Sequence, residues 1–230
     1  MTFSDIQLKR LISQFLLVPP VPKITETKRE ERRQQILDAA LRCFSRDGFH
    51  ATTTADIVRE SGVSQGTLYL YFATKEDIVV ALADDRHQGE VFLNALAQSE
   101  QDPVQGLMLL IELYGKGLTD QRRLDMRRVG IQGWAEALRS PRIHASVVEG
   151  FSSVRAAIAL LIERGQQSGQ IRPEISPDAA ARTMIAAFQG LVLQLAWGEH
   201  VDLSACGTLI RGMIRNVLLT DAARAAFPAA

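Results

Sequence analysis

Few residues in this 230-residue chain are suited to covalent or metal chemistry. Gly62-Val-Ser-Gln-Gly66 matches the Gly-x-Ser-x-Gly pattern of a hydrolase, whose nucleophilic serine needs a strand before it and a sheet beneath it. A capped helix is predicted before Ser64 and no convincing period-2 strand is predicted anywhere, so Ser64 is better interpreted as the N-cap of a helix. The four histidines lack metal-ligand spacing and the two cysteines lie far apart. We therefore expect no enzymatic activity, no metal site and no cofactor.

Around that serine the chain has the pattern of a helix, a tight turn and a second helix. Thr53-x-x-Asp56 is a capping box that predicts the start of the first helix. Ser64 caps the second helix, in which Leu68 and Phe72 lie four residues apart and form a buried side. The residues left on or near its outer faces are Gln65, Thr67, Tyr69 and Tyr71, and Gly66 lets the backbone come close to a partner. A helix-turn-helix presents polar side chains to the major groove of DNA in this way.

The helix starts in this region are also suited to binding phosphate. Backbone N–H groups after the Thr53, Ser64 and Thr74 caps are ready anion sites, and Lys75 places a full charge beside them. We expect Lys75 to contact a phosphate, so that its replacement lowers the salt dependence of DNA binding by about one unit of slope. Residues 1–75 hold 11 Lys and Arg against 8 Asp and Glu, whereas the remainder holds 15 against 18. The small positive excess therefore lies in the segment with these motifs.

The motifs belong to a longer pattern that runs from about residue 32 to residue 82. It consists of Ile36-Leu-Asp-Ala-Ala-Leu-x-x-Phe44, Gly48-Phe49, Thr52-Thr53, Asp56-Ile57, Ser61-Gly-Val-Ser64, Gly66-Thr-Leu-Tyr69, Tyr71-Phe72 and Lys75-Glu76. This pattern resembles the DNA-binding domain of the tetracycline-repressor (TetR) family of bacterial regulators. The resemblance implies a homodimer that binds double-stranded operator DNA, with C-terminal helices that enclose a small-molecule effector and form the dimer interface. The DNA-binding residues that we predict are Arg32, Thr52, Thr53, Ser64, Gln65, Gly66, Thr67, Tyr69, Leu70, Tyr71 and Lys75.

Two positions depart from the family pattern. Gln65 stands where the family often has Lys, which exchanges a phosphate-seeking charge for an amide that can read adenine N6 and N7. Leu70 stands where the family often has His, and it could contact only apolar features such as a thymine methyl group. The operator sequence, the effector and the regulated genes therefore stay open.

Capping residues and prolines place the remaining elements. Thr74-x-x-Asp77 opens a helix expected to continue to about Gln98. Capping residues stand before prolines at positions 102–103, 140–141 and 176–177, and each pair predicts a helix start. We predict an all-α fold with a three-helix N-terminal DNA-binding domain and a C-terminal helical domain. The expected segments are an N-terminal arm (1–27), the helix-turn-helix domain (28–75) and the ligand-binding and dimerisation domain (76–230).

The arm is longer than is usual in the family. We expect it to be disordered because chain termini fray, and the alternative is that its Lys9, Arg10 and Lys23 touch DNA. Its short apolar stretch is interrupted by polar residues and followed by prolines, unlike a signal peptide. No apolar run reaches the about 20 residues of a membrane helix. We therefore expect a cytoplasmic protein that does not contact a membrane.

Apolar residues at helical spacing in the C-terminal domain are first of all core, and a subset could line an effector pocket. The residues that we predict at that pocket are Leu107, Ile111, Tyr114, Ile131, Trp134, His144, Phe151, Val154, Phe188 and Gln189. Small residues on the later helices permit close approach and suit a two-fold four-helix interface, although they could pack only within one subunit. The residues that we predict at the dimer interface are Ala156, Leu160, Ala180, Met184, Ala187, Leu191 and Trp197.

The net charge excludes a histone-like protein, because 26 Lys and Arg are balanced by 26 Asp and Glu and the isoelectric point is near 6.9. A small basic site on a neutral body remains compatible with it. We therefore expect a ligand-responsive DNA-binding regulator, specifically a repressor that a small molecule releases from a palindromic operator. The alternative is an α-helical small-molecule-binding protein or enzyme that does not bind DNA.

Overall fold

A computed structural model of the chain describes residues 26–84, 94–95, 97–99, 102–119 and 121–226. Residues 1–35 and 36–230 form two units, and each is described by itself. The described residues are largely helical and include no strand beyond an isolated bridge between Ile171 and Leu219. The prediction of an all-α fold is confirmed. Most of the arm expected at residues 1–27 lies outside the described residues.

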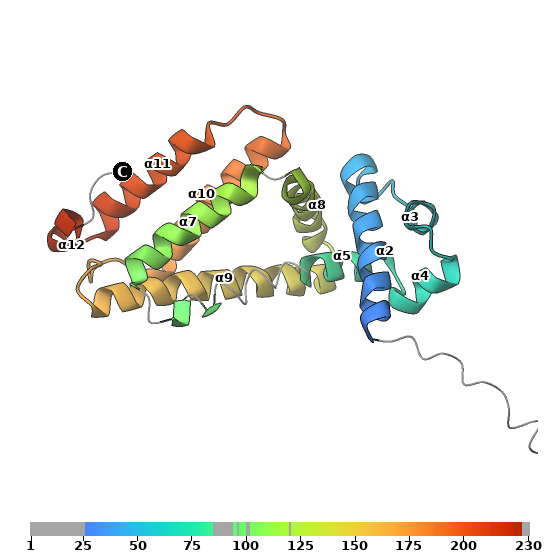
Figure 1. Cartoon of the computed structure of the whole chain (residues 1–230), viewed down its shortest axis with the longest axis horizontal. Helices are drawn as coiled ribbons and strands as arrows, with labels where there is room; N and C mark the ends of the chain where they lie inside the picture. The colour runs from blue at the N-terminus through green and yellow to red at the C-terminus, as the bar shows by residue number, and fades with distance from the viewer. Residues whose placement is uncertain (1–25, 85–93, 96, 100–101, 120, 227–230) are drawn as a thin grey trace, which may run out of the picture. The chain divides into compact units, whose positions relative to one another are not determined.

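The first helices are α2 (Glu26–Asp47), α3 (Thr54–Ser61), α4 (Gln65–Tyr71) and α5 (Lys75–Asp84) (Figure 1). The later ones are α7 (Pro103–Thr119), α8 (Gln121–Ala137), α9 (Pro141–Gln167), α10 (Pro177–Ala196), α11 (Leu203–Met213), the π-helical η1 (Ile214–Leu218) and α12 (Asp221–Ala226). Of the helix expected from Lys75 to about Gln98, α5 covers the first part and residues 94–95 and 97–98 are helical. Residues 85–93 lie outside the described residues.

Side-chain caps fix the helix starts at the positions that the sequence predicts. Thr53 Oγ1 accepts a hydrogen bond from Asp56 N at 3.2 Å, and Asp56 Oδ2 accepts one from Thr53 N at 2.9 Å, which completes the capping box before α3. Thr74 and Asp77 form the same reciprocal pair before α5, at 2.7 and 3.1 Å. These bonds span three residues each, so they form as soon as the local chain is helical.

The proline-led helices begin in the same manner. Ser140 caps α9 and Ser176 caps α10 through their hydroxyl oxygens, with proline in the first turn of each helix. Asp102 Oδ1 accepts hydrogen bonds from the backbone N–H groups of Val104 and Gln105, both at 2.9 Å, at the start of α7. Each of these three predicted starts is confirmed.

Two buried clusters hold residues 36–230 together. The first joins α2, α3, α4 and α5 and includes the fully buried Phe44, Ile57, Leu68 and Ile78. It continues to Leu82, past the domain boundary expected at residue 75, because α5 packs its apolar side onto the helix-turn-helix. The second cluster joins α7, α9, α10 and the chain from η1 to residue 219; its fully buried members include Leu107, Leu161, Ile162 and Ile171.

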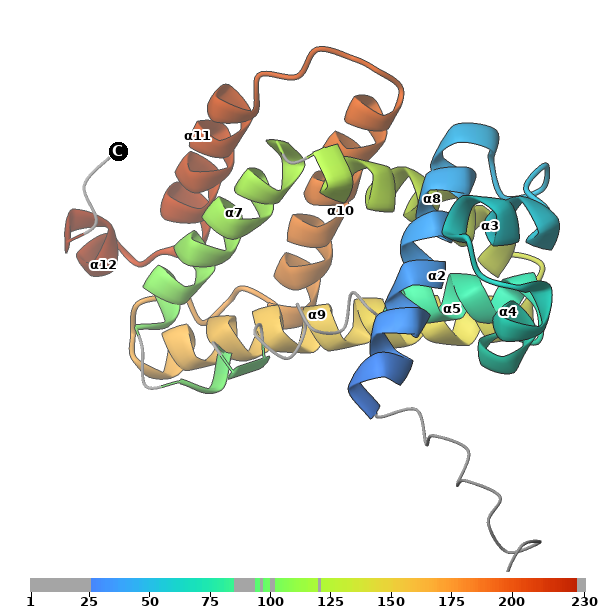
Figure 2. The same ribbon diagram turned by 45° about the vertical axis from the view of Figure 1, so that its right-hand side comes forward.

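Helix α9 takes part in both clusters. Its first turns contribute Ile143 to the first cluster, and its later turns contribute Ile158 and Leu161 to the second. Figure 2 shows α9 as a long helix, and it contacts α5, α7, α8 and α10. Helix α9 and its neighbour α8 therefore connect the helix-turn-helix to the later helices.

Candidate nucleic-acid interface

The turn between α3 and α4 holds the two helices as a rigid pair. Gly62 ends α3 with a φ of 69°, in the left-handed region, and its N–H donates to Val58 O at 2.9 Å. Ser64 then starts α4, since its Oγ accepts from Thr67 N at 3.1 Å. Val63 between them is buried in the first cluster. A capped and packed turn of this kind fixes the direction in which α4 projects.

The exposed side of α4 carries the side chains that the sequence predicts at DNA. Leu68 is fully buried, whereas Gln65 and Gly66 are exposed. Tyr69 is 46% exposed and Leu70 is 73% exposed. Thr67 is half-buried, with its hydroxyl 2.8 Å from Ser64 Oγ, and Tyr71 packs against the first cluster. The face therefore offers an amide, a phenol and free methyl groups, which are groups that base edges in a major groove can accept.

A hydroxyl pair links α3 and α4 next to this face. Tyr69 Oη lies 3.4 Å from Thr54 Oγ1, at the first residue of α3. Thr54 is not among the predicted DNA-binding residues. Its position directly after the Thr53 cap is the signal that could have identified it, because the first helical residue lies beside the exposed backbone amides.

The start of α3 is less open to an anion than expected. Asp56 accepts hydrogen bonds from both the backbone N and the hydroxyl of Thr53 and one from Arg59 Nη2 at 2.6 Å. The hydrogen bonds from the Thr53 hydroxyl and backbone N–H, followed by that from Arg59, lower the pKa of Asp56 to about 2. A carboxylate that stays ionised already occupies the positive end of the helix, so a phosphate there meets a like charge.

Thr52 and Lys75 differ from their predicted roles. Thr52 is 1% exposed, and its hydroxyl donates to Gly48 O at 2.8 Å, so the side chain serves the turn. Lys75 Nζ donates to Phe49 O at 2.5 Å and to Thr52 O at 2.9 Å, and lies 4.3 Å from the Phe49 ring centroid. Burial lowers the pKa of Lys75, with Glu136 acting in the opposite direction. The ammonium thus binds carbonyls of the protein itself.

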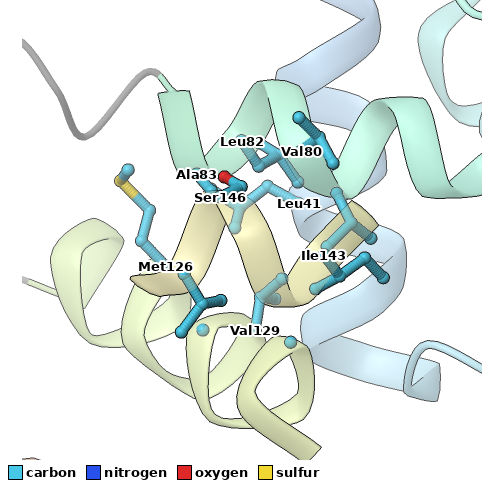
Figure 3. A pocket seen from close by; sticks show the side chains of 12 residues that line it. Leu41, Val80, Leu82, Ala83, Met126, Val129, Ile143 and Ser146 are labelled. Carbon is cyan, nitrogen blue, oxygen red and sulfur yellow. The ribbon is translucent and has the colours of Figure 1, made fainter. Parts of the chain in front are cut away.

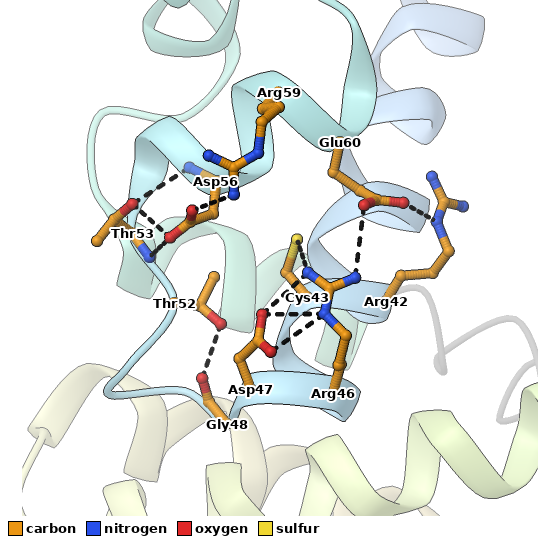
Figure 4. A network of polar contacts seen from close by, with 10 residues as sticks. All are labelled: Arg42, Cys43, Arg46, Asp47, Gly48, Thr52, Thr53, Asp56, Arg59 and Glu60. Atoms are coloured by element: carbon orange, nitrogen blue, oxygen red, sulfur yellow. Dashed lines mark hydrogen bonds and ion pairs between the residues drawn. The ribbon is translucent and has the colours of Figure 1, made fainter.

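Two arginines of α2 form ion pairs with nearby acidic residues, one of which is on α3 (Figure 4). Arg42 Nε lies 2.7 Å from Glu60 Oε1, and Arg46 Nη1 lies 3.6 Å from Glu60 Oε2. Arg46 also pairs with Asp47 at 2.9 Å. Hydrogen bonding from Arg42 lowers the pKa of Glu60. Burial raises the pKa of the Cys43 thiol beneath this network, which fits a core residue and not a reactive thiolate.

Arg32 belongs to the N-terminal unit and is exposed on α2. Its Nη1 donates to Gln35 Oε1 at 2.7 Å. The exposure is compatible with the predicted phosphate contact. Thr53 and Ser64, the capping residues of α3 and α4, are exposed as well.

The predicted effector-pocket residues divide into groups. Leu107 is fully buried in the second cluster, and Ile111 and Val154 pack against it, so these three are core. His144 is exposed in the first turn of α9, away from any interior. Ile131 and Gln189 are half-buried, and the Tyr114 side chain lies outside the described residues.

The remaining predicted pocket residues make two separate aromatic contacts, one between α8 and α9 and one between α8 and α10. The ring centroids of Trp134 on α8 and Phe151 on α9 are 5.6 Å apart. Arg127 Cζ on α8 lies 4.6 Å from the ring centroid of Phe188 on α10. The Trp134–Phe151 rings are tilted by 52°, and such aromatic and cation–π contacts occur in ordinary cores as well as beside ligands.

A small cavity lies elsewhere, between α2, α5, α8 and α9 (Figure 3). Its volume of about 20 Å³ has room for one water molecule. The walls are apolar, with Leu41, Val79, Met126 and Ile143 among them, and Ser146 Oγ has no hydrogen-bond partner among the described residues. A water needs two or more polar partners, so this cavity is a gap in packing and not an effector site.

The predicted dimer residues lie partly in the core and partly on the surface. Leu160, Ala180 and Met184 pack against the second cluster, and Leu191 is half-buried. Ala156, Ala187 and Trp197 are exposed. Sequence reasoning missed Leu209, Met213 and Val217, which are exposed at intervals of four along α11 and η1. That spacing was the available signal.

Helices α9 and α10 are also long and apolar enough to cross a bilayer, by length and composition alone. In α10 only Ala181 and Val192 are buried, and α11 has no buried residue. The large apolar side chains that these helices leave exposed, such as Trp197 and Leu209, are expected where a protein surface meets a partner.

Comparison with known proteins agrees with these features. The family described as "Bacterial regulatory proteins, tetR family" matches residues 36–82, and "BetI-type transcriptional repressor, C-terminal" matches residues 103–219. The first match spans residues 36–82 and so includes the members of the first buried cluster from α2 to α5.

Individual relatives cover most of the chain. The chain is 30% identical to the HTH-type transcriptional regulator TtgR of Pseudomonas putida, over 78% of this chain and 87% of that protein. A transcriptional regulator from Saccharomonospora viridis in complex with choline is 27% identical with a TM-score of 0.68, covering 83% of this chain and 99% of that one. SmeT, the repressor of the multidrug efflux pump SmeDEF of Stenotrophomonas maltophilia, is 25% identical with a TM-score of 0.69, covering 86% and 93%.

Proposed function

Because this chain belongs to the TetR family of bacterial regulatory proteins, we propose that it is a dimeric repressor which a small molecule releases from a palindromic operator. The DNA-binding regulator itself follows from the family. The observation that carries the proposal is the exposed face of α4 on a helix-turn-helix whose starts are fixed by side-chain caps. Such a face has no use in a protein that only stores a ligand.

We assign base contacts to the exposed side of α4. Gln65, Tyr69 and Leu70 are the exposed residues there, and Thr67 borders them. The amide of Gln65 suits an adenine and Leu70 suits a thymine methyl group. The exposed cap Ser64 and the exposed Arg32 are the proposed backbone contacts, whereas Thr53 is bonded to the Asp56 carboxylate and is not assigned one.

The second copy of the chain is proposed to cover α10 and α11. Leu209 is 66% exposed, and Met213 and Val217 continue the same stripe. Trp197 at the end of α10 is exposed as well. A two-fold dimer would bury these apolar side chains against their own copies and set the two recognition helices roughly 34–36 Å apart, one turn of DNA.

The effector is proposed to bind beside the aromatic rings of α8, α9 and α10. Trp134, Phe151 and Phe188 supply flat apolar surface, and the guanidinium of Arg127 carries a positive charge over one ring. A neutral or anionic aromatic compound fits this chemistry better than a quaternary ammonium ion, because a buried cation next to Arg127 is repelled. The choline complex of the Saccharomonospora viridis regulator is therefore a poor guide to the effector of this chain.

The release is a two-state process. Helix α5 begins directly after the helix-turn-helix and packs against α9, which is the helix that also joins the later ones. A compound that binds one separation of the recognition helices better than the other lowers operator affinity by that difference.

Selection of bound duplexes from a random pool tests the function. We expect an inverted repeat whose half-sites lie one helical turn apart, followed by release when aromatic compounds are screened against the complex. A purified dimer that shows no preference among duplexes at low ionic strength would support the small-molecule-binding alternative instead. Binding that no compound reverses would indicate a constitutive repressor.

A further inference from the structure

The turn between α2 and α3 is bonded to a helix of the effector domain. Gln132 on α8 donates from Nε2 to Phe44 O at 3.2 Å and accepts at Oε1 from Phe49 N at 2.7 Å. A single carboxamide therefore holds both the last turn of α2 and the start of the connection to α3. Its donor and its acceptor are both used on backbone, which leaves the group one orientation.

Two further bonds come from the same side of α8. Glu136 Oε1 lies 2.8 Å from His50 Nε2, and Ser45 Oγ donates to Asp125 Oδ1 at 3.2 Å. Residues 125, 132 and 136 are seven and four apart, so they lie on one face of the helix. That face is aimed at residues 44–50.

The turn between α2 and α3 is held together by hydrogen bonds and leads directly into the N-cap of α3. Thr52 N donates to Gly48 O at 3.2 Å and its hydroxyl donates to the same oxygen, so residues 48–52 form a closed unit. Lys75 Nζ binds the carbonyls of Phe49 and Thr52 from α5. The next residue, Thr53, is the N-cap of α3. Moving this turn therefore moves the start of the helix-turn-helix.

Another face of α8 carries the aromatic contacts. Trp134 stands beside Phe151, and Arg127 stacks on Phe188. Gln132 and Trp134 are two residues apart on one helix, so they point in different directions while sharing one rigid backbone. A compound that displaces α8 at Trp134 displaces Gln132 with it.

We propose that Gln132 is the positioning residue that couples the effector domain to the helix-turn-helix through the α2–α3 turn. This inference rests on the proposed function. It adds a route separate from α5, whose first turn is held to α9 by the ion pair of Asp77 with Arg142.

Coupling can be measured without an effector, because coupling free energies are reciprocal. If Gln132 couples the two regions, DNA that moves the turn also changes the surroundings of Trp134. The protein is labelled with 5-fluorotryptophan, its two resonances are assigned with Trp197→Phe, and the wild-type-selected duplex is added to saturation. We expect the Trp134 resonance to shift in the wild type. In Gln132→Met, which keeps the volume and loses both hydrogen bonds, the shift falls to half or less and duplex affinity falls about tenfold.

Controls separate positioning from general destabilisation. Arg142→Met breaks the α9–α5 ion pair and is expected to keep the Trp134 shift, as is Gln105→Met at an exposed glutamine of α7. Gln132→Leu, which also loses both hydrogen bonds, replaces Gln132→Met should that variant fail to fold.

An unchanged Trp134 shift in the Gln132 variants overturns the inference, as does a wild type that binds the duplex with no shift. A wild type that binds no duplex overturns the proposed function and the inference with it.

Discussion

The helix-turn-helix and the α10–α11 surface differ in what they leave in solvent. Around α3 and α4 the buried side chains are apolar apart from Ser61, and most exposed ones are polar, with Leu70 as the main exception. On α11 the exposed side chains include Leu209 and Met213, and no residue of that helix is buried. The apolar side chains of the first region are therefore mostly buried within one chain. Those of the second region would be buried only by a second surface packed on them. The difference separates the residues proposed to contact DNA from the residues proposed to form the dimer.

The largest expected effect concerns assembly. Leu209→Glu places a carboxylate in the proposed interface twice per dimer, and unpaired buried charges are costly. We expect the dimer dissociation constant to rise by at least about a hundredfold, measured by sedimentation equilibrium. Ser204→Glu, on the exposed first turn of α11, is the matched control and leaves the dimer intact. A Leu209→Glu protein that stays dimeric would place the interface elsewhere.

Adjacent leucines of the recognition helix sharpen the contrast between core and surface. Leu68→Ala empties a fully buried site and is expected to lower the free energy of unfolding by about 2–5 kcal/mol. Leu70→Ala is expected to leave that free energy within about 0.5 kcal/mol and to weaken operator binding. Urea unfolding and fluorescence anisotropy with the selected duplex measure the two effects. Equal losses of stability would mean that Leu70 packs in the protein.

Replacement of Lys75 tests whether its ammonium group binds a DNA phosphate or stabilises the folded protein. Lys75→Met removes the donor from two backbone carbonyls, so we expect the free energy of unfolding to fall by about 1–3 kcal/mol with no change in the salt slope of DNA binding. Urea unfolding and duplex titrations at several salt concentrations give both quantities. A slope that falls by about one unit would restore the phosphate contact expected from sequence.

The capping box gives a smaller effect with a defined pH dependence. Thr53→Ala removes the cap of α3 and is expected to cost about 1 kcal/mol. The pKa of Asp56 is lowered to about 2 in the folded protein, so its stabilising bonds are fully present above its unfolded pKa of about 4. They are lost as the pH falls from about 4 through about 2. Asp56→Asn should flatten that part of the stability profile in urea titrations, and an unflattened profile would assign the acid sensitivity to other groups.

The smallest change is a charge added to the recognition face. Gln65→Lys restores the residue that the family often carries, and we expect a salt slope steeper by about one unit per subunit together with altered preference at one base pair of each half-site. Duplex titrations with single-base variants measure both. An unaltered slope would show that residue 65 does not approach a phosphate.

Sequence reasoning succeeded where the deciding contacts are local. The capping boxes at Thr53 and Thr74 and the proline-led starts of α7, α9 and α10 involve residues two or three apart, so residue type and spacing predict them. The buried side of α4 followed from the spacing of Leu68 and Phe72. Lys75 was harder to interpret, because a lysine at a helix start looks alike whether it binds phosphate or a nearby carbonyl.

By itself the sequence determined the all-α fold, the family and the helix-turn-helix, because each depends on short-range patterns. Only the tertiary structure decided which side chains form hydrogen bonds between helices and are thereby used within the protein. Gln132 meets Phe44 across 88 positions, and Lys75 meets Phe49 across 26. Contacts over such separations follow from how helices pack, and packing depends on the shape of all partners at once.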